Sequence, residues 1–162
     1  MSTILLAIGA LEKLSVTPLK SSRFYSTKPV DCPLGSPDFI NVAVHLTVSS
    51  EETPESLLIK LQAIEKSLGR QLKTIHNEAR SLDLDLILFG NEIRNSPQLT
   101  LPHPRAHFRA FVLTPLADLD PDLRLTGMNE TVRALKQKCS DVELVTIVSN
   151  SQADYPKNRI GG

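Results

Sequence analysis

A strict alternation of leucine and aspartate from Leu82 to Leu86 is the feature that most constrains the fold of this 162-residue chain. Successive side chains of a strand point to opposite sides, so the leucines would share one face, and Asp83 and Asp85 would share the other, about 7 Å apart. One apolar and one wet face is typical of an antiparallel sheet whose other side is covered. The pattern therefore predicts a strand over residues 82–89 in an α+β fold.

The remaining patterned segments favour the same class of fold. The continuous apolar run from Ile4 to Ile8 ends at Gly9 and predicts a buried strand, followed by a short helical stretch. Alternating or β-branched runs predict strands over residues 21–27, 39–48 and 142–148, and helical spacing predicts helices over residues 53–69, 106–116 and 130–138. The order β-α-β-β-α-β predicts a ferredoxin-like antiparallel sheet with helices packed on it. We expect one domain over residues 1–148 and a disordered tail over residues 149–162.

Composition excludes several classes of partner. Eighteen basic residues balance eighteen acidic ones, so no overall field attracts nucleic acid or an anionic membrane. Tryptophan is absent and there are two tyrosines and five phenylalanines, which argues against a base-stacking, RNA-binding module. The apolar N-terminal run is too short to span a membrane. Because Cys32 and Cys139 lack metal-ligand spacing, we expect reduced thiols and a cytoplasmic location.

The aspartate pair is a candidate metal site. Two neighbouring carboxylates repel each other unless a cation lies beside them, and Mg²⁺ takes one or two carboxylates and completes its shell with water and phosphate oxygens. Taken alone, this alternation is more often the wet face of a strand. Its neighbours change that balance: Arg80 precedes the pair, and His103 lies between two prolines and shortly before Arg109. Such donors suit a polyphosphate, so the region predicts a magnesium-nucleotide site.

Several short motifs occur here in one order and with regular spacing. They are Phe24-Tyr-Ser-Thr-Lys-Pro29, Pro37-Asp-Phe-Ile-Asn41, Ile64-Glu-Lys-Ser-Leu-Gly-Arg70, Arg80-Ser-Leu-Asp-Leu-Asp-Leu-Ile-Leu-Phe-Gly90, Leu99-Thr-Leu-Pro-His-Pro-Arg105 and Arg109-Ala-Phe-Val-Leu-Thr-Pro-Leu116. Over residues 21–123 the chain thereby closely resembles the hydroxymethyl-dihydropterin pyrophosphokinase family of folate biosynthesis. The resemblance implies a ferredoxin-like fold and transfer of diphosphate from ATP to 6-hydroxymethyl-7,8-dihydropterin, with release of AMP.

The resemblance also implies roles for individual residues. The catalytic set is Arg70, Arg80, Asp83 and Asp85, of which Asp83 and Asp85 bind two Mg²⁺ ions together with ATP. The expected ATP-binding residues are Gln62, Glu65, Thr100, His103 and Arg109, and the expected pterin-binding residues are Thr27, Val30, Phe39, Asn41 and Phe111. Judged without the resemblance, both phenylalanines fit a core and Asn41 fits a wet strand face. We expect a monomer that associates with other enzymes of the folate pathway.

Two departures from the family pattern leave a second interpretation open. The family's first strand runs into Gly-Ser-Asn and a helix of several turns, whereas here Ile8-Gly9 continues directly into residues 10–14. The family's lid region carries a tryptophan and a further arginine that residues 71–79 lack. Because lid closure excludes water and completes such sites, the alternative is a relative that binds nucleotide or pterin with weakened or no catalysis.

Overall fold

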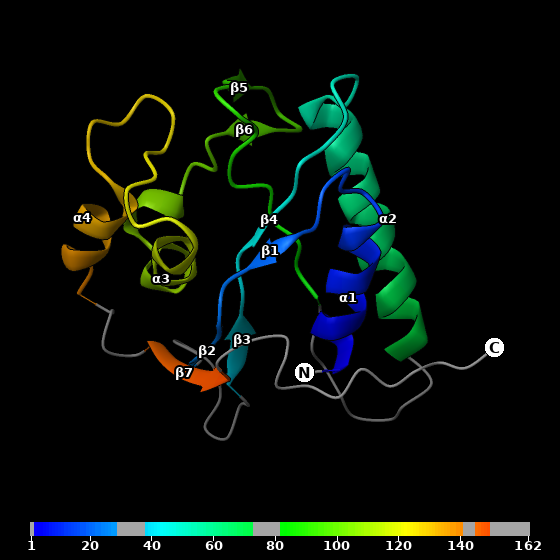
Figure 1. Cartoon of the computed structure of the whole chain (residues 1–162), viewed down its shortest axis with the longest axis horizontal. Coiled ribbons are helices and arrows are strands. Elements are labelled where there is room, and N and C mark those ends of the chain that lie inside the picture. Colours follow the sequence, from blue (N-terminus) through cyan, green and yellow to red (C-terminus); the bar gives the residue numbers. More distant parts are fainter. Residues whose placement is uncertain (1, 29–37, 73–81, 141–144, 150–162) are drawn as a thin grey trace. The chain divides into compact units, whose positions relative to one another are not determined.

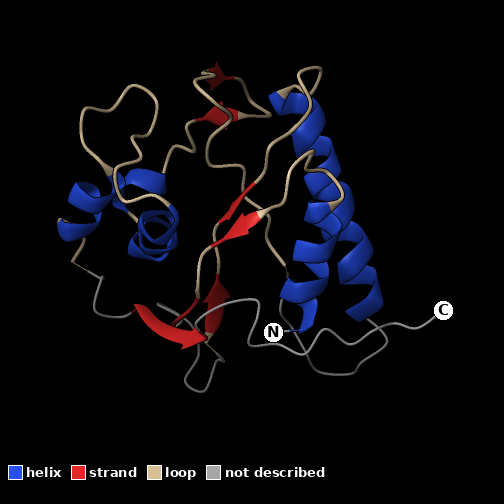
Figure 2. Cartoon of the chain, in the orientation of Figure 1, coloured by secondary structure: helices blue, strands red, loops and turns tan. Residues whose placement is uncertain are grey.

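The structure is a computed structural model, and it describes residues 2–28, 38–72, 82–140 and 145–149. Helices pack with small β-sheets, as the colouring of Figure 2 shows, so the expected α+β class is confirmed. The chain divides into two compact units. Unit 1 contains Met1–Lys20, His45–Ala106 and Leu125–Met128, and unit 2 contains Ser21–Val44, His107–Arg124 and Asn129–Gly162.

Two helices form the core of unit 1. Helix α1 (Ser2–Glu12) packs against α2 (Pro54–Leu72), and the two lie side by side in Figure 1. Helix α2 begins where Thr53 caps it: the Ser56 backbone N–H donates to Thr53 Oγ1 (3.1 Å). Full burial of a leucine or isoleucine contributes roughly 1.5–3 kcal/mol. The buried side chains of the two helices are Ala7, Ile8, Leu11, Leu57, Leu61 and Leu68.

The strand expected over residues 4–8 is wrong, because these residues lie inside α1. A continuous apolar run of this length does not distinguish a buried strand from a buried helix. Its buried residues Ala7, Ile8 and Leu11 are spaced as one face of a helix, and Gly9 is exposed. Burial against α2 therefore selects the helical conformation over the strand.

Replacing Gly9 tests this helix. A Cβ atom at Gly9 would meet nothing within 4 Å. Gly9→Ala should therefore stabilise the protein by about 0.5–1 kcal/mol, since alanine loses less backbone entropy in a helix interior. Thermal denaturation would measure the change, with Glu12→Gln at the exposed end of α1 as a control that leaves helix propensity nearly unchanged. An unchanged or lower melting temperature for Gly9→Ala would contradict the helix.

The strand expected over residues 82–89 is also not found: these residues pair with no strand in the described part of the chain, and Figure 2 draws them as loop. The segment ends in a turn in which the Glu92 backbone N–H donates to the Phe89 carbonyl (2.9 Å). Gly90 adopts a φ of 53° there, a conformation that favours glycine. Strand β5 (Arg94–Asn95) then pairs antiparallel with β6 (Thr100–Leu101). The alternating pattern of residues 82–86 thus predicted which side chains are exposed, but it did not predict whether the segment pairs with a strand.

A three-stranded sheet forms the centre of unit 2. Strand β2 (Phe24–Thr27) lies between β3 (Phe39–Asn41) and β7 (Val145–Ser149) and pairs antiparallel with both. Helix α3 (Ala110–Leu119) packs on β2, and α4 (Val132–Gln137) packs on α3. The largest fully buried side chains of unit 2 are Phe24, Leu113, Pro115 and Val132.

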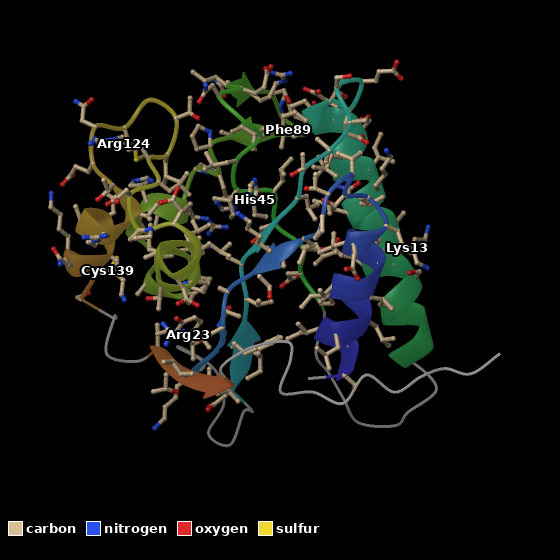
Figure 3. All side chains as sticks on the ribbon, viewed as in Figure 1. Lys13, Arg23, His45, Phe89, Arg124 and Cys139 are labelled. Carbon is tan, nitrogen blue, oxygen red and sulfur yellow. The ribbon has the colours of Figure 1, made fainter. Side chains whose placement is uncertain are left out.

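The strand expected over residues 39–48 is interrupted. Strand β3 ends at Asn41, and Val44–His45 form β4, which pairs instead with β1 (Lys20–Ser21); His45 is labelled in Figure 3. The Ser22 hydroxyl accepts a hydrogen bond from the Ala43 backbone N–H (3.0 Å) at the break. The β-branched run over residues 39–48 therefore contributes to two strands that pair with different partners, β3 with β2 and β4 with β1.

The strand expected over residues 21–27 is split between β1 and β2, which belong to different sheets. The remaining expected elements agree with the structure where it describes them. The helix expected over residues 53–69 is α2, and the one over residues 130–138 is α4. The helix expected over residues 106–116 begins with a 3₁₀ turn, η1 (Ala106–Phe108), and continues as α3. The last strand is β7, and residues 150–162 of the expected tail lie outside the described part. The single domain over residues 1–148 stays a prediction.

An ion pair joins β2 to α3 within unit 2. The backbone N–H, Nε and Nη2 of Arg23, labelled in Figure 3, all donate to the Asp118 carboxylate at 2.6–2.9 Å. Burial by itself would raise the pKa of Asp118, but the hydrogen bonds from Arg23 outweigh it and hold that pKa below its ordinary value. The Arg23 guanidinium also lies 5.8 Å from the ring centroid of Tyr25, and burial raises the pKa of that phenol.

Asp118→Ala should destabilise the protein by about 1–2 kcal/mol at pH 7, because three donors lose a charged acceptor while Arg23 remains partly solvated. Since folding lowers the pKa of Asp118, its contribution is present above the ordinary value near 4 and is lost as the pH falls through the folded-state value. The difference in unfolding free energy between parent and variant should therefore begin to shrink as the pH falls below about 4, and should vanish only below the folded-state pKa of Asp118. Asp122→Ala removes a more exposed ion pair with Arg133 and should change stability much less. Equal losses for the two variants would contradict the structural role of Asp118.

Candidate functional site

The acid-bearing segment of unit 1 is held by two hydrogen bonds to its backbone, one with a side chain and one with another backbone group. The Leu84 N–H donates to Glu65 Oε1 on α2 (2.6 Å), and the Ile87 carbonyl accepts from the His103 N–H (2.9 Å). Between and around these two contacts, the leucines are half-buried, whereas Asp83 and Asp85 are exposed. The structure thus brings together the aspartate pair, Glu65 and the His103 loop, which come from three separate parts of the sequence.

The His103 loop has a defined conformation. It follows β6, which contains Thr100, and a cis peptide bond joins Leu101 to Pro102. His103 Nδ1 accepts a hydrogen bond from the Arg105 N–H (3.2 Å). The loop is therefore fixed both by its own turn and by the hydrogen bond to Ile87. Gln62, the remaining expected nucleotide residue of α2, is exposed one turn before Glu65.

The aspartates fit the oxygen-donor chemistry of magnesium. Within the described part of the chain, neither Asp83 nor Asp85 has a hydrogen-bond or ion-pair partner, so their oxygens are available to a cation. The described residues contain no group of three or more His, Cys, Asp or Glu side chains that could hold a metal. Mg²⁺ needs no such group, because one or two carboxylates suffice when water and phosphate oxygens complete the shell.

A second group of expected site residues lies in unit 2, on the pair β2–β3. The register places Thr27 opposite Phe39 and Tyr25 opposite Asn41. Across this pair, Asn41 Nδ2 donates to Thr27 Oγ1 (3.0 Å). Phe39 is 50% exposed, which is unusual for a core phenylalanine and leaves its ring free to contact a flat ligand. Three of the five residues expected at the pterin are thus neighbours.

The start of α3 carries two further expected residues. Arg109 is the N-cap of the helix, and its carbonyl accepts the Leu113 N–H (2.9 Å). Its guanidinium lies 5.4 Å from the ring centroid of Phe111, a cation–π contact. Phe111 is only half-buried in the first turn. Helix geometry therefore fixes the spacing between a cation and an aromatic ring.

Three expected residues cannot be placed. Val30 and Arg80 lie outside the described residues. Arg70 lies within α2, but its side chain is outside the description. Their expected roles stay predictions.

Sequence reasoning missed several tertiary contacts of the two units. It placed Glu65 near nucleotide but gave no sign of its hydrogen bond to Leu84, and it gave no role to Arg23, Asp118 or the Ser26–Asp38 hydrogen bond (2.9 Å). Arg23 and Asp118 are 95 positions apart, and no local pattern pairs them. Only the β2–β3 register, a short-range signal, would have indicated the Ser26–Asp38 pair.

An α+β protein with an available carboxylate pair beside an imidazole loop has the donors of a phosphoryl-transfer enzyme that uses a metal-bound nucleotide. Comparison with known sequences gives the particular family: the one described as 7,8-dihydro-6-hydroxymethylpterin-pyrophosphokinase (HPPK) matches residues 1–121. The chain belongs to this family. Its enzymes use ATP, are generally magnesium-dependent and transfer diphosphate from ATP to hydroxymethyldihydropterin in folate synthesis, as expected from the motifs.

Three relatives illustrate the similarity. The 2-amino-4-hydroxy-6-hydroxymethyldihydropteridine pyrophosphokinase of Haemophilus influenzae is 39% identical over 132 residues, covering 81% of this chain and 80% of that protein. The enzyme of the same name from Pseudomonas aeruginosa is 42% identical over 120 residues, covering 74% and 72%. The "Folic acid synthesis protein fol1" of Pneumocystis carinii is 42% identical over 127 residues, which are 75% of this chain but only 17% of that protein.

The helices in the described ranges do not meet the requirements for crossing a bilayer. None of them combines the length and the apolar character that a membrane span needs.

The Thr27–Asn41 hydrogen bond generates a prediction for the pterin side. Thr27→Val keeps the shape of the side chain but removes the acceptor of Asn41 Nδ2, so binding of a pterin analogue should weaken by about 5- to 10-fold. Thr27→Ser retains the hydroxyl and should bind as the parent does. Calorimetry measures both, with an ATP analogue as a second ligand whose affinity should not change. Equal weakening of both ligands by Thr27→Val would contradict a local effect on the pterin.

Proposed function

We propose that this chain is itself a catalytically competent pterin pyrophosphokinase, which binds ATP through the nucleotide residues expected from the motifs and binds the pterin through Thr27, Val30, Phe39, Asn41 and Phe111. The supporting observation is that Asp83 and Asp85 are exposed and unpaired within the described residues while their backbone is fixed by Glu65 and His103. Free carboxylates on a fixed backbone are what a metal-nucleotide site requires.

Asp83 and Asp85 hold two Mg²⁺ ions in this proposal. The chemistry that bound Mg²⁺ would supply at these two carboxylates is neutralisation of the phosphate charge of ATP. The chain would supply further positive charge through Arg70, Arg80 and Arg109, and His103, whose Nδ1 accepts the Arg105 N–H, would donate a hydrogen bond to a phosphate through its other ring nitrogen. Gln62 and Thr100 contact the nucleotide as neutral hydrogen-bonding groups. The protein's task is alignment and cancellation of charge, which diphosphate transfer chiefly needs.

The pterin is bound by residues of unit 2. Asn41, oriented by Thr27, hydrogen-bonds the polar edge of the ring, and Phe39 and Phe111 stack on it. Val30 completes the apolar surroundings. The pterin hydroxymethyl oxygen forms a bond to the β-phosphorus, the bond from that phosphorus to the oxygen it shares with the α-phosphate breaks, and AMP leaves. The hydroxyl proton passes to solvent, so the step is balanced without a redox partner.

The wider setting follows from chemistry and from the relatives. The reduced thiols expected from the sequence fit a cytoplasmic enzyme, which we propose acts as a monomer. Since 127 residues of this chain match 17% of a much longer folic acid synthesis protein, we further propose association with other enzymes of the folate pathway. Sedimentation of the purified chain, alone and with such enzymes, measures both properties.

Asp83→Asn and Asp85→Asn test the proposed function. Each variant should form AMP from ATP, Mg²⁺ and hydroxymethyldihydropterin at a rate lower by about 100-fold or more, the scale found when one charge-stabilising group is lost. Asp122→Asn removes an exposed carboxylate from another part of the chain and should leave the rate unchanged. Absence of AMP formation by the folded parent protein, or full activity of either site variant, would refute the proposal.

A second candidate function, a binding protein with weakened catalysis, is favoured by two observations. Residues 4–8 lie in α1 where the family pattern begins with a strand, and residues 82–89 have no strand partner among the described residues. A parent chain that binds an ATP analogue through Asp83 and Asp85 but forms no AMP would support this candidate over the first.

A further inference from the structure

The Glu65 carboxylate is used in a way that its position in α2 does not reveal. Its Oε1 atom accepts the Leu84 N–H at 2.6 Å, and Leu84 lies between Asp83 and Asp85. Hydrogen bonds to a charged acceptor are short and about twice as strong as neutral ones. The contact therefore fixes the peptide plane from which both aspartates are oriented.

The segment needs such a contact because it belongs to no sheet in the described part of the chain. Residues 82–89 pair with no described strand, so the hydrogen bonds that normally orient alternate side chains are absent. Two like charges on neighbouring positions also tend to rotate apart. Two hydrogen bonds, from Leu84 to Glu65 and from His103 to Ile87, take the place of the interstrand hydrogen bonds that a sheet would provide.

Helix α2 is a suitable anchor for this contact. Leu61, one turn before Glu65, and Leu68, one turn after it, are both buried, so the backbone around Glu65 is immobilised by packing. Glu65 itself is half-buried, which strengthens its hydrogen bond relative to one in open solvent. A third negative charge near two aspartates is unfavourable, and a charge-assisted bond to the backbone offsets that effect.

We propose that Glu65 is a positioning residue, which orients Asp83 and Asp85 for the metal-bound nucleotide through its hydrogen bond to the Leu84 N–H. The inference rests on the proposed function for the identity of the ligand, but the hydrogen bond itself does not depend on it. A positioning acceptor needs an oxygen and not a charge. A residue that contacts the nucleotide or metal through its charge needs the carboxylate itself.

Three variants separate these roles: Glu65→Gln keeps the acceptor oxygen, Glu65→Ala removes it, and Lys66→Ala changes an exposed neighbour of α2 as a control. The first measurement is the hydrogen-exchange rate of the Leu84 amide in the protein without metal or nucleotide, by NMR. We expect exchange to be about 10-fold faster or more in Glu65→Ala, and close to the parent rate in Glu65→Gln and Lys66→Ala.

The second measurement is Mg²⁺-dependent binding of a non-hydrolysable ATP analogue by calorimetry. Glu65→Ala should weaken it by about 10- to 100-fold, the range typical of groups that orient metal ligands, whereas Glu65→Gln should lose no more than about 5-fold. Circular dichroism and melting temperature establish that each variant is folded. Unchanged Leu84 exchange in Glu65→Ala, or equal loss of binding in Glu65→Gln and Glu65→Ala, would overturn the proposal.

Asp83→Asn in the same binding assay distinguishes failure of the proposed magnesium site from failure of the proposed role of Glu65. If Asp83→Asn binds the analogue as tightly as the parent, the proposed magnesium site is wrong. Glu65 then cannot orient metal ligands there, although its hydrogen bond to Leu84 would remain. If Asp83→Asn loses binding while the Leu84 amide exchanges identically in the parent and Glu65→Ala, the magnesium site stands and Glu65 has no positioning role.

Discussion

The buried stripe of α2 is the interaction on which unit 1 depends. Leu57, Leu61 and Leu68 are buried at helical spacing and fix the helix as it packs against α1. The same helix carries Glu65, whose hydrogen bond to Leu84 orients the aspartate segment. Apolar packing, which is non-directional, thus provides a rigid base for a directional contact at the site. A change that loosens the packing of α1 against α2 would therefore disturb the orientation of Asp83 and Asp85 without altering either residue.

In unit 2 an ion pair, and not helix packing alone, fixes the position of the strand that carries expected site residues. Its central strand β2 is buried at Phe24 and Tyr25 and contributes Thr27 at its end. The ion pair between Arg23 and Asp118 ties the beginning of that strand to α3. The pair is partly buried and has three hydrogen bonds, so its stabilisation exceeds that of an exposed pair. Thr27 is consequently presented from a strand that is tied to α3 beside its first residue.

Short sequence patterns predicted the elements that are stabilised by contacts between residues close in the sequence. Helix α2 combines a capping Thr53, a first-turn proline and an apolar stripe, and its start was predicted to within a residue. The two expected strands that were wrong depended on partners: residues 4–8 bury a helical face against α2, and residues 82–89 pair with no strand among the residues that the structure describes. Burial was only partly predicted: Ala7 and Ile8 are buried but Leu6 is exposed, and the leucines of residues 82–86 are only half-buried. The conformation of both segments depended on the neighbouring elements, which an apolar pattern does not specify.

The sequence by itself determined the family, because short motifs at fixed spacing carry the chemistry, and it determined that Asp83 and Asp85 would be exposed, because aspartates are rarely buried unpaired. Tertiary structure alone decided how those aspartates are held. The Glu65–Leu84 and His103–Ile87 hydrogen bonds join residues 19 and 16 positions apart, and such contacts form only after helix and loop have packed. Hydrogen bonds are directional and short-ranged, so their partners follow from the packed backbone and not from the order of residues.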